Sequence, residues 1–145
     1  MNPSSAALIN SMLGRIWSTK PIALDAGLLL IRLTVAVLMI PHGWAKFTHF
    51  AERADKFPDP LGVGSPVSLF LVISAELFCS VLLALGLFTR IVLVPLMIAM
   101  GVVVLVIHAD DPVSKKEHAL LFLIPYAGLF LTGPGGYSLD RLLKK

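Results

Sequence analysis

One apolar stretch, residues Leu28–Lys46, constrains the fold of this chain more than any other feature. It reads LLLIRLTVAVLMIPHGWAK, which is apolar enough to sit in a bilayer, yet it carries Arg32, His42 and Lys46. On a helix that advances about 100° per residue, His42 lies about 80° and Lys46 about 40° from Arg32, so one flank carries all three side chains. A charge at bilayer depth is disfavoured by roughly 3 kcal/mol or more, so it normally faces protein or water and has a partner. The stretch therefore predicts a small membrane bundle built around this polar flank.

The composition of the whole chain indicates the same class of protein. Hydrophobic residues make up 57% of the 145 residues and charged residues only 14%, and the mean hydropathy is +0.86. The net charge of +3 is scattered among loops and chain ends, which is typical of a protein that faces anionic lipid. We therefore expect a lipid bilayer and not nucleic acid as the partner. A single cysteine, Cys79, excludes an internal disulfide or a C-x-x-C pair within this chain.

Long apolar segments separated by short polar turns predict an all-α, membrane-spanning four-helix bundle over residues 21–145. The four predicted spans are Leu24–Phe47, Val67–Phe88, Ile91–Ile107 and His118–Leu131. In front of them, apolar residues recur at helical spacing over residues 1–20, which predicts an amphipathic helix on the membrane surface. A disordered leader remains the alternative for this segment.

Four spans place both termini on one side of the membrane, and the basic residues favour the cytoplasmic side. We expect a multi-pass protein of the inner (plasma) membrane of a prokaryote. The ends of the first and third spans and the starts of the second and fourth then share the outer face. The polar residues expected to gather there, as candidates for ligand binding or proton transfer, are His42, Lys46, His108, Glu117 and His118.

Glu76 is the only charged residue within the second span. By depth it falls between Arg32 and His42, and either could pair with it. We expect a buried ion pair between Arg32 and Glu76, because an unpaired arginine would be the more unfavourable of the two. No two histidines have the i, i+4 spacing that would preform a metal site, so no metal is expected.

Several motifs taken together resemble the DoxX family of small four-helix membrane proteins. They are R-L followed by H-G-x-x-K, A-E-L in the second span, G-L-x-T-R at its end, and the closing G-P-G-x-Y-S-L-D. The resemblance covers about Leu28 to Leu143 and implies a four-helix bundle associated with membrane redox chemistry, including quinone-linked oxidoreductases. It marks the following residues without assigning them a catalytic role: Arg32, His42, Gly43, Lys46, Glu76 and Arg90.

Three functions remain open. The chain is a quinone-interacting subunit of a membrane redox system, a noncatalytic scaffold subunit of an oxidoreductase complex, or a carrier of a small solute. We expect the first, with His42, Lys46 and His118 supplying donors to the quinone and a proton path. The sequence has no haem-attachment, flavin or Rossmann motif, so any electron carrier is diffusible or held by a soluble or membrane oxidoreductase partner. The sequence does not decide whether the chain forms a homo-oligomer.

Overall fold

The computed structural model describes residues 23–144, together with residues 12, 14 and 21. The predicted surface helix, residues 1–20, lies almost entirely outside the described residues. All regular secondary structure in the described part is helical, with no strand, as the sequence predicted. In chain order its elements are α2 (Leu24–Thr48), α3 (Phe50–Arg53), α4 (Ser65–Ile73), η1 (Ser74–Cys79), α5 (Ser80–Leu85), α6 (Thr89–Val102), η2 (Val103–Ile107), α7 (Val113–Thr132) and α8 (Leu139–Leu143).

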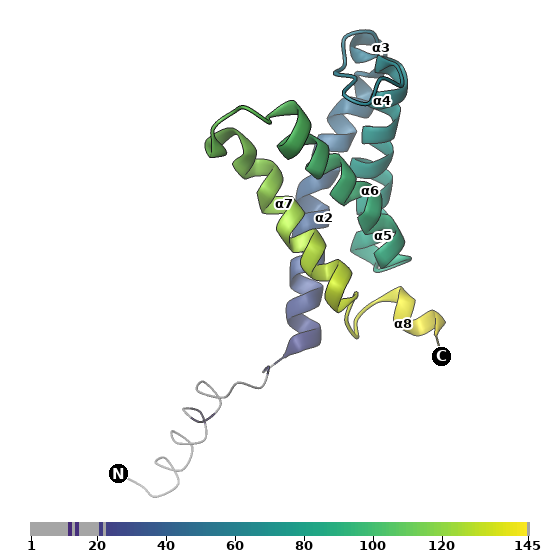
Figure 1. Ribbon diagram of the computed structural model, residues 1–145. Helices are drawn as coiled ribbons and strands as arrows, with labels where there is room; N and C mark the ends of the chain where they lie inside the picture. The colour runs from purple at the N-terminus through teal and green to yellow at the C-terminus, as the bar shows by residue number, and fades with distance from the viewer. Residues whose placement is uncertain (1–11, 13, 15–20, 22, 145) are drawn as a thin grey trace, which may run out of the picture.

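Four long rods run alternately in opposite directions (Figure 1). The first is α2, the second is α4, η1 and α5 in succession, the third is α6 followed by η2, and the fourth is α7. The loops at residues 54–64 and 108–112 lie at one end of the bundle, and the start of α2 and helix α8 lie at the other (Figure 1). We call these the loop end and the terminal end.

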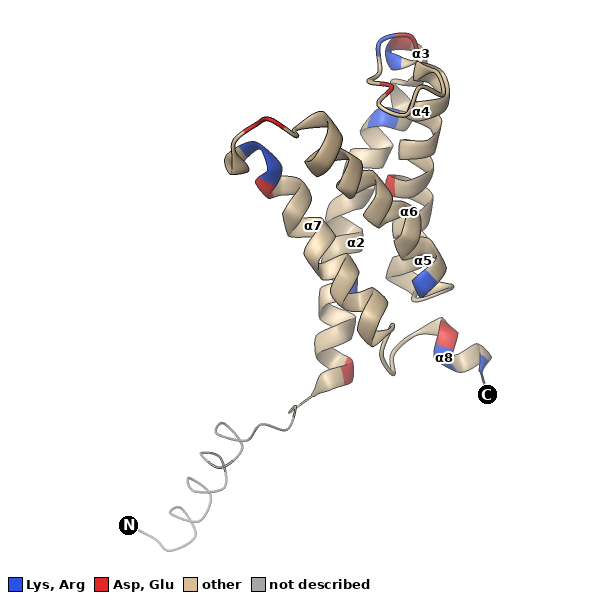
Figure 2. Cartoon of the chain, viewed as in Figure 1, with Lys and Arg blue, Asp and Glu red and all other residues tan. Residues whose placement is uncertain are grey.

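Three of the rods are long and apolar enough to cross a membrane: Leu24–Thr48, Ser65–Leu85 and Thr89–Ile107. The fourth, α7, has 20 residues, but its first turns contain Lys115, Lys116 and Glu117. Helix α7 therefore starts five residues before the predicted apolar span, which begins at His118. Charged residues concentrate toward the two ends of the bundle (Figure 2), as expected for helices that cross an apolar layer.

The core lies between the four rods and is formed mainly by apolar side chains. Ala36 of α2, Leu83 of α5, Leu93 and Leu96 of α6, and Tyr126 of α7 are completely buried. Large apolar side chains also cover the outside of the rods, among them Leu30, Val37, Ile98 and Ile124. An outer surface of this kind is stable against lipid, where all backbone polar groups are satisfied within the helices.

The second rod contains a π-helical turn, η1, at its centre. The wider turn lies where Glu76 enters the bundle, and π-turns inside helices are frequent at functional positions. The rod ends at Gly86, whose backbone has φ 67°. A Cβ there would come within 2.8 Å of the Arg32 guanidinium, so glycine at this turn makes room for Arg32 as well as for the left-handed conformation.

Candidate functional site

Two histidine rings from facing helices meet near the loop end of the bundle. His42 of α2 and His118 of α7 have ring centroids 5.2 Å apart in an edge-to-face arrangement. One turn further along α7, the buried ring of Phe122 lies 5.3 Å from His118 and 6.3 Å from His42. Such edge-on contacts are the favoured geometry of aromatic pairs. The sequence prediction that His42 and His118 gather from facing helices agrees with this geometry.

The histidine pair stands at one end of an apolar groove between α2 and α7. The groove has a volume of about 560 Å³ and opens on the outer surface of the bundle. Below the histidines its walls are formed by Ile31, Thr34 and Leu38 of α2 and by Leu121 and Pro125 of α7. Its volume lies in the range of small-molecule sites, and an apolar wall with a few polar groups at one end is typical of them.

Lys46 and Glu76 form an ion pair one turn beyond His42, with 2.5 Å between Lys46 Nζ and Glu76 Oε2. The Glu76 side chain is buried and a fifth of the Lys46 side chain is exposed. The predicted Arg32–Glu76 pair is therefore wrong, because Glu76 pairs with Lys46 instead. The physical reason is the register of the two helices: Gly43 packs directly on the backbone of η1, where an added Cβ would lie 2.6 Å from the amide nitrogen of Leu77. This contact places Glu76 beside the turn that carries Lys46.

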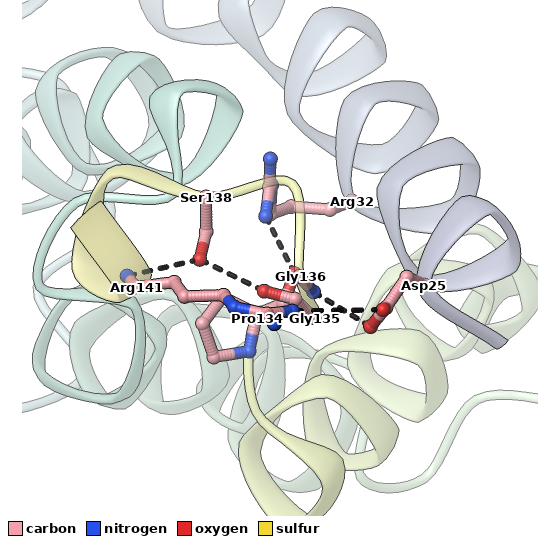
Figure 3. A network of polar contacts seen from close by, with 7 residues as sticks. All are labelled: Asp25, Arg32, Pro134, Gly135, Gly136, Ser138 and Arg141. Atoms are coloured by element: carbon pink, nitrogen blue, oxygen red, sulfur yellow. Dashed lines mark hydrogen bonds and ion pairs between the residues drawn. The ribbon is translucent and has the colours of Figure 1, made fainter. Parts of the chain in front are cut away.

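Arg32 lies about 21 Å along α2 from Lys46, at 1.5 Å per residue, and is bound to the other end of the chain. Its side chain is only 1% exposed. Nη1 donates to the carbonyl of Pro134 and Nη2 to that of Tyr137, each at 2.6 Å. Figure 3 shows the guanidinium group reaching from α2 to the segment after α7. Arg32 thus satisfies backbone carbonyls where the sequence predicted a carboxylate partner.

Two aspartates attach the same C-terminal segment (residues 133–143) to the bundle. Asp25 accepts a hydrogen bond from the amide of Gly136 at 2.6 Å (Figure 3). Asp140 accepts from the amides of Phe88 at 2.7 Å and Thr89 at 2.8 Å, and so caps the start of α6 from a distant part of the chain. Burial alone would raise the pKa of Asp140, but the donors at Thr89 and Phe88 outweigh it and hold the pKa below its ordinary value.

The other predicted site residues do not join the histidine pair. His108 Nδ1 contacts Asp111 at 2.8 Å in the loop before α7, and Glu117 is exposed beside His118. Neither residue lines the groove. Among the residues that the structure describes, no group of three or more histidine, cysteine or acidic side chains is arranged to hold a metal ion.

Phe122 and Tyr126 were missed as neighbours of the histidine pair. They follow His118 at four and eight residues, which places all three on one face of α7. Their rings are 6.1 Å apart, so one aromatic row runs from the groove into the core. The spacing was readable from the sequence. The carbonyl partners of Arg32 were not, because no side-chain pattern marks a backbone acceptor.

The DoxX family model matches residues 27–109. The chain belongs to the DoxX family. The matched residues include Arg32, His42, Lys46 and Glu76. The match ends before His118 and the C-terminal segment, so the contacts of those two parts are known from the structure and not from the family match. With three helices suited to span a bilayer, this family member is a membrane protein.

Bacterial relatives are similar over most of their length. "Inner membrane protein YqjF" of Escherichia coli is 31% identical over 83% of this chain and 95% of the relative. An uncharacterized membrane protein of Mycobacterium tuberculosis is 33% identical over 79% of this chain and 80% of the relative. An uncharacterized protein of Haemophilus influenzae is 29% identical over 81% of this chain and 83% of the relative. No solved structure matches the chain.

Proposed function

We propose that this DoxX-family protein is an integral membrane subunit of a redox system and that it binds quinone in the groove between α2 and α7. One observation carries the proposal: two imidazoles from facing helices, 5.2 Å apart, stand at one end of an apolar groove. A quinone has the matching shape, with a polar ring that accepts hydrogen bonds and an apolar tail. Because the groove opens laterally, such a molecule enters from the bilayer without crossing water.

The groove supplies the polar and apolar contacts in the required order. The imidazole N–H groups of His42 and His118 donate to the carbonyl oxygens of the ring, while Ile31, Leu38 and Leu121 pack against the tail. Quinone accepts two electrons and two protons on reduction. An imidazole is suited to deliver a proton at that position, because its ring nitrogens can release and take up a proton. Lys46 and Glu76, one turn away, form an ion pair whose opposite charges act on His42 in opposite directions.

The rest of the proposal concerns location and partners. We place the protein in the inner membrane, where the name of the Escherichia coli relative places that protein. The distribution of basic residues favours cytoplasmic termini. Electrons come from a soluble or membrane oxidoreductase partner, since no motif for a resident electron carrier was found in the sequence. The groove is formed entirely by α2 and α7 of one chain. Quinone binding therefore does not require a second copy and is compatible with a homo-oligomer.

Thermal unfolding of the purified protein with a quinone analogue tests the proposal. The analogue should raise the melting temperature of the wild type, and His42→Ala or His118→Ala should abolish the increase. His108→Ala is the matched control, because it removes an imidazole that does not line the groove and should keep the increase. Quinone in the lipid extract of the purified protein, near one molecule per chain, gives independent support.

A noncatalytic scaffold subunit is the second candidate. It is favoured by the fact that Arg32, Lys46 and Glu76 all make contacts that hold the bundle together. It predicts that no quinone analogue changes the melting temperature at any pH, or that His42→Ala leaves an observed increase intact. Transport of a small solute has less support, because the groove runs along the outside of the bundle.

A further inference from the structure

A second recess lies at the terminal end of the bundle, far from the histidine pair. It has a volume of about 540 Å³ and forms where α6 begins, α7 ends and the C-terminal segment crosses between them. Three basic residues line it: Arg90 of α6, Arg141 of α8, and Lys144, which follows α8. The groove between α2 and α7 shares none of these residues.

The positive charge of this recess is only partly neutralised. Its two acidic side chains, Asp25 and Asp140, are already engaged by the amides of Gly136, Phe88 and Thr89. Among the described residues, no carboxylate lies within ion-pair distance of Arg90 or Lys144, and Arg141 is 3.7 Å from Asp25. Three cations therefore face two carboxylates, both of which already accept hydrogen bonds from the backbone.

The three basic side chains differ in how freely they can move toward a ligand. Arg90 donates through Nε to the carbonyl of Phe130 at 3.1 Å and through Nη2 to that of Leu131 at 3.4 Å, which fixes its guanidinium at the end of α7. The Arg141 side chain is 61% exposed. Lys144 is exposed as well. Arg141 and Lys144 can thus move toward a ligand, while Arg90 forms a fixed positive wall.

The recess lies at the ends of the apolar spans, which places it at the level of the lipid headgroups. The apolar spans Leu24–Thr48 and Thr89–Ile107 begin beside it, and α7 ends beside it at Thr132. Tyr137, in the segment that crosses it, is 63% exposed, and exposed tyrosines are enriched at the level of the lipid headgroups. The three basic residues therefore lie where phospholipid phosphates are concentrated.

We propose that this recess binds the phosphate of an anionic phospholipid, with Arg141 and Lys144 as its mobile donors and Arg90 as the fixed one. Basic recesses between membrane helices are suited to such headgroups. The acyl chains would lie along the exposed apolar side chains next to the recess, Phe88 and Ile91. This site is independent of the proposed quinone groove and does not depend on it.

Lipid titration in a neutral detergent tests the site, with melting temperature as the readout. Phosphatidylglycerol should stabilise the wild type, whereas phosphatidylcholine and inorganic phosphate at equal concentration should not. The variant R141Q/K144Q should raise the dissociation constant for phosphatidylglycerol roughly 25-fold, about fivefold for each basic residue removed. The charge-retaining variant R141K/K144R should bind within a few fold of the wild type.

The matched control removes the same net charge at the loop end. Lys115 and Lys116 lie at the start of α7 and do not line the recess, so K115Q/K116Q should bind phosphatidylglycerol like the wild type. Equal losses in the two double variants would show that net charge alone attracts the lipid and would overturn the site. Equal stabilisation by phosphatidylcholine, or by inorganic phosphate, would overturn its assignment to an anionic lipid.

Discussion

Lys46 and Glu76 hold α2 against η1 through a single ion pair, and the energetics of that pair can be measured. Replacing Glu76 with Gln or Lys46 with Met leaves a partly buried partner without its counter-charge. We expect each single change to destabilise by about 3 kcal/mol, the low end for a broken buried pair, because a fifth of the Lys46 side chain reaches solvent. The double variant should lose far less than the sum, as determined from unfolding in detergent.

The pairing that the sequence favoured provides the control for this cycle. Arg32→Leu combined with Glu76→Gln should give additive losses, because Arg32 contacts the carbonyls of Pro134 and Tyr137. Strong coupling between Arg32 and Glu76, together with additivity for Lys46 and Glu76, would contradict the observed register.

Gly43 sets that register, so adding one methyl group should disturb it. In Gly43→Ala the new Cβ would lie 2.6 Å from the amide nitrogen of Leu77 and 2.8 Å from the carbonyl carbon of Glu76. Backbone atoms cannot move aside as a side chain can, so we expect a loss of about 1–3 kcal/mol, typical of overpacking. Gly27→Ala is the matched control on the same helix, because nothing lies within 4 Å of its Cβ position. It should be neutral or slightly stabilising, and equal losses in both variants would contradict the close packing.

Single residues also show what the sequence could and could not reveal. His42, Lys46 and Glu76 stand out because polar side chains are unfavourable in apolar stretches. His42 and Lys46 lie on the polar flank of α2, and Glu76 lies in η1 of the second rod. Their partners depend on how one helix slides along another. Gly43 and the π-turn η1 set the offset of α2 along the second rod. Neither produces a periodic sequence pattern from which this offset could be predicted.

At the scale of elements, the C-terminal segment acts as a clasp across the terminal end of the bundle. Arg32 binds its carbonyls and Asp140 caps α6. The folded protein holds the pKa of Asp140 below its ordinary value, so folding favours the carboxylate. The stabilisation that Asp140 provides is therefore complete above its unfolded pKa, about 3.9, and is lost as the pH falls through the lower folded pKa.

The acid stability of the protein should reflect this capping. Melting temperatures measured from pH 6 to pH 2.5 should fall more steeply below about pH 4 in the wild type than in Asp140→Asn. At pH 6 the variant should melt lower, because an amide caps α6 less well than a carboxylate at a helix start. Parallel curves for the two proteins would show that Asp140 does not contribute to the acid transition.

Arg32→Gln tests the clasp from its other side. The shorter, neutral side chain cannot donate to both Pro134 and Tyr137, so the C-terminal segment should detach more easily. Limited proteolysis should then cleave within residues 133–143 faster than in the wild type. Arg90→Gln, which loses hydrogen bonds to the carbonyls of Phe130 and Leu131 but none to residues 133–143, is the control. An unchanged cleavage rate in Arg32→Gln would contradict the clasp.

The sequence predicted the long elements closely where apolar composition alone limits them. Leu24–Thr48 and Thr89–Ile107 differ from the predicted spans by one or two residues. Helix α7 starts at Val113 rather than His118, because lysine and glutamate are good helix formers and extend the helix beyond its apolar part. The sequence did not predict that the C-terminal segment is attached to the bundle. Its attachment depends on backbone carbonyls and amides, which every sequence contains.

On the scale of the whole molecule, the two proposed binding sites lie toward opposite ends of the four alternating rods. The histidine pair lies toward the loop end, and the basic recess lies at the terminal end (Figure 1). Short connections between apolar helices force neighbours to run antiparallel. This is why the alternating order of up and down rods could be predicted. The distribution of polar sites between the two ends follows from that order.

Cysteine labelling in intact cells tests this arrangement together with its orientation. Single cysteines at Pro60, in the loop at residues 54–64, and at Val113, the first residue of α7 after the loop at residues 108–112, should react together with a membrane-impermeant maleimide. A cysteine at Leu142, whose side chain is exposed at the terminal end, should react only after permeabilisation if the termini are cytoplasmic. The native Cys79 is half-buried within the second rod, and replacing it with serine removes its background. Labelling of the cysteine at position 142 alone in intact cells would show that the orientation is the opposite one, and would leave the bundle model intact. Labelling of Pro60 and Val113 from opposite sides would rule out the bundle, because their loops could not then share one end.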